Sequence, residues 1–384
     1  MSDLEPIAPP ACLGVLGGGQ LGRYFVIAAR TMGYRTMVLE PDPHAPAGAV
    51  ADEHIVAPYD DDDALLRLGS ACAVVTTEFE NPPAHALHAL AKITTVRPSP
   101  EAIAIAQDRR AEKRFLAGIG APVAPYAMVE HEADLARIDL GFPAIVKTAR
   151  LGYDGKGQVG VETVVEVGSA WRELGSVACV VEQRLALDAE LSVVLARTAT
   201  GDCMPYPVAH NTHAGGILDI TVVPARVPEP LAQRAVDLAA QIATELEYVG
   251  VLAVELFVAG GELVVNELAP RPHNSGHWTL DAALTSQFEQ QVRAVCGLPL
   301  GDTRLAAPAA AMVNLLGDLW GPGEPDWSAA LDAPNAHLHL YGKHEARPGR
   351  KMGHLTVTAD TPDAASARAL ACRGHARRDL QLDR

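Results

Sequence analysis

The sequence predicts an α/β domain followed by an α+β region, and two observations carry this prediction. Over residues 11–105, apolar runs alternate with segments of helical periodicity, which is typical of parallel strands in one doubly wound sheet. Over residues 106–305, apolar strands come in pairs joined by glycine-rich turns, as in antiparallel hairpins. We therefore expect a loose tail at 1–10, a doubly wound domain over 11–105, a second domain over 106–305, and a small β-rich C-terminal domain over 306–384.

Composition limits the kind of partner. The 384-residue chain is 48% hydrophobic and 20% charged, which is ordinary for a globular protein with sizeable cores. Its formal net charge of −16 argues against nucleic acid and anionic membranes, so we expect small-molecule ligands. The six cysteines form no C-x-x-C pair, the first ten residues lack a basic start and an apolar core, and no stretch holds eighteen uninterrupted apolar residues. These features predict reduced thiols and a cytoplasmic protein.

The first domain begins with a glycine turn. Gly17, Gly19 and Gly22 follow an apolar run and fit the dinucleotide pattern G-x-G-x-x-G, and Glu40 ends the next run, where a ribose hydroxyl would be held. This context predicts a Rossmann-like fold. It leaves the ligand open, because a tight strand-to-helix turn needs glycine whether or not a dinucleotide binds there.

Five apolar runs are the predicted parallel strands of this domain: "CLGVLG", "RTMVLE", "EHIVAP", "CAVVTTEFE" and "ITTVRP". In a doubly wound sheet, ligands lie beyond the carboxyl ends of the strands. The segments "GGGQLG", "EPD" and "TEFEN" all fall at such ends. We therefore expect them to gather around one crevice.

The second domain carries two carboxylates on one hairpin. In "VGVLAVELFVAGGELVVNELAPRPHNSGH", a hairpin centred near Gly261 puts Glu255 directly opposite Glu267, with Cβ atoms about 4.5 to 5.5 Å apart. Two such carboxylates repel each other, and hard oxygen ligands suit magnesium, so the segment predicts a metal site formed by Glu255 and Glu267. In the alternative register, one of the two glutamates faces solvent.

A lysine and a glycine loop lie upstream of this hairpin. The stretch "GFPAIVKTARLGYDGKGQVGV" puts Lys147 at the end of a short apolar strand, before glycines at 152, 155 and 157. A strand lysine under a flexible glycine loop can hold and cover nucleotide phosphates, although such a loop is more often only a mobile turn. Farther along, "CVVEQRLALDAELSVV" places a link after a buried strand and Glu190 on the next strand, which suits adenine at the link and a ribose at Glu190.

The C-terminal region contains a basic loop in an otherwise acidic chain. The stretch "YGKHEARPGRK" brings together Lys343, Arg350 and Lys351. Arginine and lysine side chains together are common phosphate ligands. We therefore expect this loop to bind a phosphate and to fold back over the crevice of the first domain.

In this order, the parts resemble the ATP-grasp superfamily, in which a Rossmann-like domain precedes a strand lysine, a glycine-rich flap, a hinge with a ribose acid and two magnesium carboxylates. Seven segments are also similar to signature segments of the 5-(carboxyamino)imidazole ribonucleotide synthase family, the bicarbonate-using ligases of purine synthesis. They are "LGGGQLGR", "EPDPHAPAGAVAD", "TEFEN", "GYDGKGQ", "GILDITVVPAR", "NELAPRPHNSGHWT" and "RPGRKMGHL". The resemblance runs from about residue 12 to about residue 360. Pro82 departs from the family pattern, in which an aliphatic residue follows "EFEN".

The resemblance implies an activity. The chain is expected to join ATP, bicarbonate and 5-aminoimidazole ribonucleotide through carboxyphosphate, with Mg²⁺ as cofactor. The products would be ADP, phosphate and the N-carboxylated ribonucleotide. The resemblance also implies a homodimer.

The resemblance assigns roles to residues as well. The implied ATP-binding residues are Arg109, Lys147, Gly152, Tyr153, Asp154, Gly155, Lys156, Gly157, Gln158, Glu182, Gln183, Arg184, Leu185, Glu190, His213, Asn266 and Glu267. The resemblance also implies that no dinucleotide binds at the glycine turn. The implied ribonucleotide-binding residues are Gln20, Leu21, Glu78, Asn274, Lys343, Arg350 and Lys351. The implied catalytic residues are Arg271, His273 and Asn274, with Tyr153 and Asp154 in the flap, and the metal ligands are Glu255 and Glu267.

Three rival functions are weighed against this one. A formate-dependent glycinamide ribonucleotide transformylase, or another ATP-grasp ligase, would share the phosphate-binding loop, but the transformylase pattern R-P-H-D-T-G differs from this chain at Asn274 and Ser275, and Gln20 stands where that family has an acid. An NAD-dependent oxidoreductase would leave the flap, the paired glutamates and the basic loop unexplained. A catalytically inactive ribonucleotide-binding protein is disfavoured by the intact lysine and glutamates.

Overall fold

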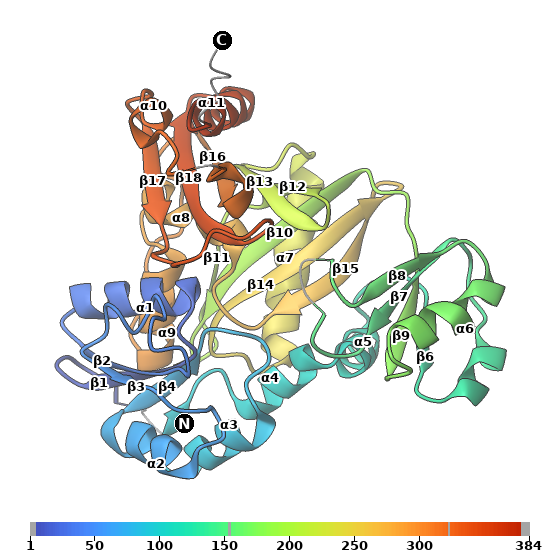
Figure 1. The fold of residues 1–384 in the computed structure, drawn as a ribbon, viewed down its shortest axis with the longest axis horizontal. Coiled ribbons are helices and arrows are strands. Elements are labelled where there is room, and N and C mark those ends of the chain that lie inside the picture. The colour runs from blue at the N-terminus through green and yellow to red at the C-terminus, as the bar shows by residue number, and fades with distance from the viewer. Residues whose placement is uncertain (1–4, 153–154, 322, 378–384) are drawn as a thin grey trace.

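The computed structural model describes residues 5–152, 155–321 and 323–377 (Figure 1). Within these ranges the strands form a five-stranded, a four-stranded and a nine-stranded sheet. The five-stranded sheet belongs to the N-terminal part of the chain, and the four-stranded sheet forms a separate lobe on the opposite side of the molecule (Figure 1). The nine-stranded sheet lies between them.

The N-terminal sheet has the strand order β3-β2-β1-β4-β5, and all of its strands are parallel, as the sequence predicts. Helices cover both of its faces, so the central strand β1 is buried along its whole length (Figure 1). The strands are β1 (Cys12–Leu16), β2 (Arg35–Leu39), β3 (Glu53–Ile55), β4 (Val74–Thr77) and β5 (Thr95–Val96). The helices are α1 (Gln20–Thr31), α2 (Asp62–Ala71), α3 (Ala84–Ala91) and α4 (Pro100–Gln107).

The four-stranded lobe is antiparallel and has the order β6-β9-β7-β8. Helix α5 (Arg109–Gly118), which begins at the N-cap residue Asp108, leads into it. The apolar face of the four-stranded sheet packs against α6 (Val164–Glu173) and the short helix η1 (Glu132–Arg137). Its strands are β6 (Tyr126–Val129), β7 (Ala144–Thr148), β8 (Gln158–Val161) and β9 (Cys179–Gln183).

The nine-stranded sheet has the order β15-β14-β10-β12-β13-β16-β18-β17, with β11 (Cys203–Pro205) paired to β10. Helix α7 (Glu229–Glu245) packs on β10 and β14, and α9 (Gln287–Cys296) lies between this sheet and α1 of the first domain. The first five strands are β15 (Glu262–Ala269), β14 (Gly250–Ala259), β10 (Ala189–Arg197), β12 (Ala209–Ala214) and β13 (Ile217–Val223). Two short helices, η2 (Asn274–Gly276) and α8 (Thr279–Ala282), follow β15.

The C-terminal region is β-rich, as expected, but its strands continue the central sheet. Strand β16 pairs with β13 of the second domain and then with β18, which pairs with β17. The strands are β16 (Ala309–Leu316), β17 (Ala336–Leu340) and β18 (Lys351–Ala359), with the helices η3 (Gly317–Leu319), α10 (Trp327–Ala330) and α11 (Pro362–His375). One sheet therefore spans both regions.

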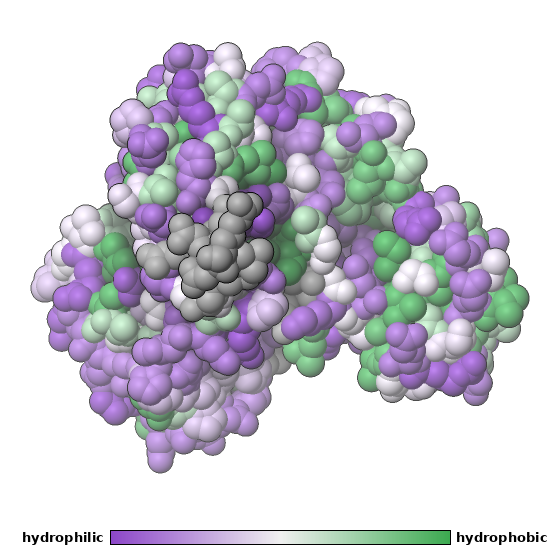
Figure 2. Space-filling model, turned by 45° about the horizontal axis from the view of Figure 1, so that its top comes forward, coloured by the Kyte–Doolittle hydropathy of each residue, from purple (hydrophilic) through white to green (hydrophobic). Residues whose placement is uncertain are grey.

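The surface is hollowed where the four-stranded lobe meets the rest of the molecule (Figure 2). Polar side chains cover most of the face shown there. None of the helices in the described ranges combines the length and the apolar character that crossing a membrane requires.

Candidate active site

A cavity of about 510 Å³ is lined by all three regions of the chain. The predicted site residues that line it are Gln20, Leu21, Arg109, Lys147, Gly152, Gly155, Lys156, Gln158, Glu190, His213, Glu255, Asn266, Glu267, Arg271, His273, Asn274 and Lys351. The predicted residues outside its lining are Glu78, Gly157, Glu182, Gln183, Arg184, Leu185, Lys343 and Arg350. Tyr153 and Asp154 lie outside the described residues.

The glycine turn before α1 binds the protein's own carboxylates. The backbone N–H groups of Gly19 and Gly22 donate to the two oxygens of Glu78, at 2.9 and 3.2 Å, and Gly18 N–H donates to Glu40 at 2.8 Å. A helix N-terminus attracts anions, and in dinucleotide-binding proteins this place holds the pyrophosphate. Here Glu78 fills it. The segments that follow β1, β2 and β4 thus meet, as predicted.

Two lysines share one buried carboxylate beside the cavity. Lys147 Nζ lies 3.2 Å from Glu182 Oε2, and Lys113 Nζ lies 3.4 Å from the same oxygen. Although burial raises the pKa of Glu182, the two lysines hold it below its usual value, so the carboxylate is ionised. Lys113 also donates to the carbonyl oxygen of Asn266 at 3.1 Å. Glu182 therefore holds Lys147 at the cavity wall. The predicted adenine link, residues 182–185, does not itself line the cavity, whereas Leu187, two residues beyond it, does.

The paired carboxylates lie as predicted. The register of β14 and β15 places Glu255 directly opposite Glu267, and a β-bulge turns Asn266 toward the same place, with its Nδ2 3.5 Å from Glu255 Oε2. Burial and the charge of Glu267 raise the pKa of Glu255 to about 7. Burial also opposes ionisation of Glu267, but Arg109, 3.1 Å away, and Lys147 hold its pKa below the usual value. Such repelling carboxylates, with an amide beside them, suit a hard divalent cation.

The loop after β15 is tied to the first domain and to the C-terminal sheet. Arg271 forms an ion pair with Glu80, which follows β4. Asn274 and Asn314 of β16 exchange two side-chain hydrogen bonds, at 2.7 and 3.0 Å. Both polar atoms of the Asn274 amide thus have hydrogen-bond partners. Arg271, His273 and Asn274 all line the cavity.

His273 is held on every side. Gln287 clamps its backbone, accepting from His273 N–H at 2.9 Å and donating to its carbonyl oxygen at 2.8 Å. In the ring, Nδ1 lies 2.8 Å from Ser275 Oγ, and Nε2 lies 3.4 Å from Glu255 Oε1. Burial and the nearby Arg271 charge hold the pKa of His273 well below its usual value, so the imidazole is neutral.

Glu190 and His213 form a second polar corner of the cavity. Glu190 Oε2 lies 2.6 Å from His213 Nδ1, across the pairing of β10 and β12. Burial lowers the pKa of His213, but the Glu190 carboxylate outweighs it and the pKa is raised. Gly152, Gly155, Lys156 and Gln158 of the glycine loop also line the cavity, and Thr148 N–H donates to Gly157 O at 2.8 Å.

The basic loop folds back over the first domain, as predicted. Lys343 Nζ donates to Gln20 Oε1 of α1 at 2.5 Å and to the carbonyl oxygen of Lys351 at 2.6 Å. Lys351 lines the cavity. Arg350 donates instead to the carbonyl oxygen of Glu345 at 2.8 Å, which turns its guanidinium toward its own loop.

Reasoning from the sequence missed several residues at or beside the cavity, among them Glu80, Asn81, Glu112 and Lys113. Glu80 and Asn81 line it and belong to the quoted segment "TEFEN", from which only Glu78 was chosen. Glu112 lines it as well and accepts from Leu268 N–H at 2.6 Å, and burial raises its pKa to about 8. Lys113 stands behind the wall. Both belong to "QDRRAEKRFL", whose charges resemble those of an ordinary solvated helix.

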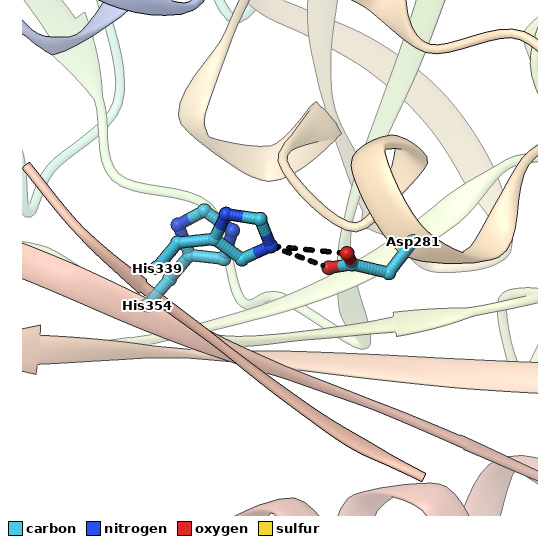
Figure 3. A group of neighbouring side chains, drawn as sticks. All are labelled: Asp281, His339 and His354. Carbon is cyan, nitrogen blue, oxygen red and sulfur yellow. Dashed lines mark hydrogen bonds and ion pairs between the residues drawn. The ribbon is translucent and has the colours of Figure 1, made fainter. Parts of the chain in front are cut away.

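A separate cluster joins α8 to the C-terminal strands. His339 Nε2 lies 2.9 and 3.0 Å from the two oxygens of Asp281, and its ring stacks on His354 with centroids 4.5 Å apart and planes within 9° (Figure 3). Imidazole nitrogens bind a metal in the plane of the ring, so two stacked rings do not direct their lone pairs at one ion. His354 Nδ1 is also bonded to Tyr341 Oη at 2.9 Å. The cluster is therefore a structural link between α8 and β17.

Comparison with known proteins agrees with this architecture. Residues 11–107 match the family model of the ribonucleotide synthetase preATP-grasp domain, residues 114–288 that of the ATP-grasp domain, and residues 310–368 that of the phosphoribosylaminoimidazole carboxylase C-terminal domain. The fold and the cavity together define an ATP-grasp ligase that begins with a preATP-grasp domain.

Relatives narrow the class. The chain is 44% identical to the N5-carboxyaminoimidazole ribonucleotide synthase of Bacillus subtilis over 360 residues, which cover 93% of this chain and 94% of that protein. The structure of the Thermus thermophilus synthetase matches with a TM-score of 0.87 at 41% identity, over 97% of this chain and 100% of that one. The Aspergillus clavatus synthase, in complex with ADP and 5-aminoimidazole ribonucleotide, matches with a TM-score of 0.85 at 30% identity, over 95% and 98% of the two chains. The chain belongs to the N5-carboxyaminoimidazole ribonucleotide synthase family.

Proposed function

We propose that the chain carboxylates 5-aminoimidazole ribonucleotide with bicarbonate at the expense of ATP, in purine biosynthesis. The observation that carries this proposal is the composition of the cavity. It places the opposed Glu255 and Glu267 between cations of the second domain, Arg109 and Lys147, and Lys351 of the C-terminal sheet. These cations can therefore neutralise two anionic substrates that bind on either side of a carboxylate pair suited to a metal ion.

The reaction has two chemical steps. A bicarbonate oxygen attacks the γ-phosphorus of ATP, the bond from that phosphorus to the β–γ bridging oxygen breaks, and ADP leaves. The exocyclic amine of the ribonucleotide then attacks the carbon of carboxyphosphate, the bond from that carbon to the phosphate oxygen breaks, and the amine loses one proton. Both partners in the first step are anions, so positioning and charge neutralisation supply most of the catalysis.

Mg²⁺ fits the carboxylate pair. Glu255 and Glu267 are hard oxygen donors that repel each other in this conformation, as the raised pKa of Glu255 shows. A bound divalent cation would supply charge neutralisation for the phosphates of ATP. Asn266, on the bulge, is the third group we assign to this corner.

The ATP site would extend from this corner to the four-stranded lobe. Arg109 and Lys147 would contact phosphates, the glycine loop would cover them, the link after β9 would hold adenine, and Glu190 with His213 would hold the ribose. The assigned ATP-binding residues are those named above for this role, including Gly152, Gly155, Lys156, Gly157, Gln158, Glu182, Gln183, Arg184 and Leu185. Tyr153 and Asp154 of the loop are assigned to ordering around substrate.

The ribonucleotide site would lie at the other end of the cavity. Gln20 and Leu21 open the helix that faces it, and Lys343 and Lys351 approach from the C-terminal sheet. Glu78 would act through the glycine turn that it fills, and Arg350 would have to turn from Glu345 to reach a phosphate. Arg271, His273 and Asn274 would hold the bicarbonate between the two sites.

The experiment that tests the function measures ADP release by the purified protein with ATP and magnesium. 5-Aminoimidazole ribonucleotide with bicarbonate should stimulate release, and the ribonucleotide in bicarbonate-free buffer should not. Glycinamide ribonucleotide with formate serves as the control. Stimulation by the control pair alone would reject the proposal in favour of a transformylase.

The assembly and the domain limits are also proposals. We assign domains to 11–105, 106–305 and 306–384 from the change of pattern along the chain, and a cytoplasmic location from the composition. We also propose a homodimer, which the family resemblance implies. Light scattering coupled to size-exclusion chromatography would test the dimer, for which a 40.5 kDa chain gives a reference mass. A mass near that of one chain would reject it.

A further inference from the structure

A stripe of buried polar side chains crosses the central sheet. Thr221 of β13 lies opposite Asn211 of β12, and Ser192 of β10 lies opposite Glu255 of β14. Thr221 and Ser192 are 0% exposed and Asn211 is 3% exposed. Their neighbours on these strands are mostly apolar. The stripe therefore spans four adjacent strands and ends at the paired carboxylates.

Hydrogen bonds join the stripe to His273 in one continuous chain. Thr221 Oγ1 donates to Asn211 Oδ1 at 2.9 Å, Asn211 Nδ2 donates to Ser192 Oγ at 3.0 Å, and Ser192 Oγ donates to Ser275 Oγ at 2.8 Å. Ser275 Oγ lies 2.8 Å from His273 Nδ1. Each group donates to the next, so the direction of one bond determines the direction of its neighbours.

The two ends of the imidazole decide that direction. The backbone N–H of Ser275 can only donate, and it lies 3.3 Å from His273 Nδ1, which must therefore accept. On the other side, Nε2 faces Glu255 Oε1 at 3.4 Å, and this oxygen offers a lone pair to a hydrogen on Nε2. The hydrogen thus belongs on Nε2. The Ser275 hydroxyl is then free to donate to Nδ1, which the chain from Thr221 requires.

Stability alone does not call for these residues. A buried hydroxyl or amide contributes only about 1 kcal/mol when bonded, and apolar side chains of similar shape in both partner positions are close to neutral. We propose that Thr221, Asn211, Ser192 and Ser275 are positioning residues that hold the His273 imidazole with its hydrogen on Nε2, directed at Glu255. This inference rests on the proposed function for its consequence, because a fixed donor at Nε2 orients a carboxylate of the proposed metal corner.

The first measurement uses no substrate. Long-range proton–nitrogen correlation spectra of protein labelled with ¹⁵N-histidine, with His273 assigned through His273→Gln, report which ring nitrogen carries the hydrogen. We expect a protonated Nε2 and an unprotonated Nδ1 in the wild type. In Thr221→Val, the Asn211 amide can rotate and reverse the chain, so the Nδ1–H form should gain population. A wild-type ring protonated at Nδ1, or a variant spectrum identical to the wild type, would overturn the proposal.

A matched control separates positioning from packing. Thr356 of β18 is also 0% exposed, and its hydroxyl has no hydrogen-bond partner among the described residues. Thr356→Val should therefore leave the His273 spectrum and the turnover number unchanged. Thr221→Val should lower kcat about tenfold or more, with little change in the KM for ATP, because outer groups of this kind typically contribute 10–100-fold. Thr221→Ser, which restores the hydroxyl, should recover both the spectrum and kcat.

The outcomes distinguish the two proposals. If ADP release does not respond to ribonucleotide and bicarbonate, the proposed function fails while the spectra still decide the tautomer. If kcat falls equally in Thr221→Val and Thr356→Val, the effect is one of packing and the positioning role is rejected.

Discussion

At the scale of single residues, Glu78 determines what the glycine turn can bind. The pattern of glycines is that of a dinucleotide site, and the fold around it is the fold that the pattern predicts. The carboxylate of Glu78 nevertheless accepts from Gly19 and Gly22, so the donors that would hold a pyrophosphate are engaged. A residue 59 positions away in the sequence thus sets the chemistry of the turn.

Glu267→Gln should abolish most turnover while leaving ribonucleotide binding nearly intact. The substitution removes a charge that Arg109 meets at 3.1 Å, and it leaves Lys343 and Lys351 untouched. Loss of one preorganised charge in an active site typically lowers kcat by about 10²-fold or more. ADP release and calorimetric titration with the ribonucleotide measure the two effects.

The matched control is Glu262→Gln on the same strand. Glu262 pairs with Arg234 on the surface, and such exposed pairs contribute about 0 to 1 kcal/mol. Its turnover should equal that of the wild type. Normal turnover in Glu267→Gln would remove Glu267 from the metal corner.

At the scale of elements, the β14–β15 hairpin confirms the predicted pairing of Glu255 with Glu267, but the pairing depends on a β-bulge that was not predicted. The turn pairs Ala259 with Glu262, and a regular ladder from there would put Asn266 opposite Glu255. The bulge at Asn266 absorbs one residue and brings Glu267 into place. From the sequence, a turn centred on Gly261 gives the same pair. The bulge itself cannot be identified from the sequence, because bulges depend on local twist and on what the extra side chain contacts.

Helix α5 offers a pH-dependent test of stability. Asp108 caps the helix by accepting from Arg110 N–H at 3.0 Å, and Arg110 and Arg150 also bind its carboxylate. Burial opposes ionisation, but these arginines lower its pKa to about 2 from the ordinary 3.8. A depressed folded-state pKa stabilises the protein above about pH 4, and this contribution is lost as the pH falls toward 2.

Asp108→Asn should therefore lower the free energy of unfolding by about 1 kcal/mol at pH 7, allowing for solvent screening. The difference from the wild type should shrink at pH 3. Urea unfolding at the two pH values measures it. Asp302→Asn is the control, because Asp302 pairs with Arg304 in the same local pattern on a more exposed loop. A difference that grows on acidification would contradict the assignment.

The sequence predicted elements better than it predicted encounters between them. Lys147, Glu255 and Glu267 could be found from pattern, because each follows from a strand, its period and a turn. Ser192 and Lys113 could not, since their roles depend on groups 83 and 69 positions away that approach only in the folded chain. The family resemblance supplied most of the other site residues, and seventeen of all the site residues named from the sequence line the cavity.

At the scale of the whole molecule, the cavity exists only because three regions meet. Leu21 and Tyr24 of α1 pack with Phe288 of α9 and Tyr341 of the C-terminal region in one buried cluster. The ion pair between Arg271 and Glu80 joins the second domain to the first. The hydrogen bond from Lys343 to Gln20 joins the C-terminal region to the first domain. The residues assigned to ATP and to the ribonucleotide therefore belong to different regions that direct contacts join.

Lys351→Ala should affect the two substrates unequally. Lys351 lines the cavity at the end assigned to the ribonucleotide phosphate, and a charge-assisted hydrogen bond contributes about 1.5 to 3 kcal/mol. We expect the KM for the ribonucleotide to rise about tenfold or more, and the KM for ATP to change little. Steady-state ADP release with each substrate varied in turn measures both.

Arg347→Ala provides the control in the same loop. Arg347 pairs with Glu345 and is exposed, so neither KM should change. Equal increases in both KM values for Lys351→Ala would mean that the phosphate end of the cavity is misassigned.

The continuous central sheet also has a consequence for how the protein is made. Strand β13 ends at Val223, but its neighbour on one side, β16, begins only at Ala309. At about 5–20 residues per second, a ribosome needs several seconds to synthesise the intervening chain. During that time one edge of β13 has no strand to pair with, and open edges attract other chains. Slow steps in translation between these strands would therefore favour aggregation of the nascent chain, and a chaperone that covers the edge of β13 would protect it.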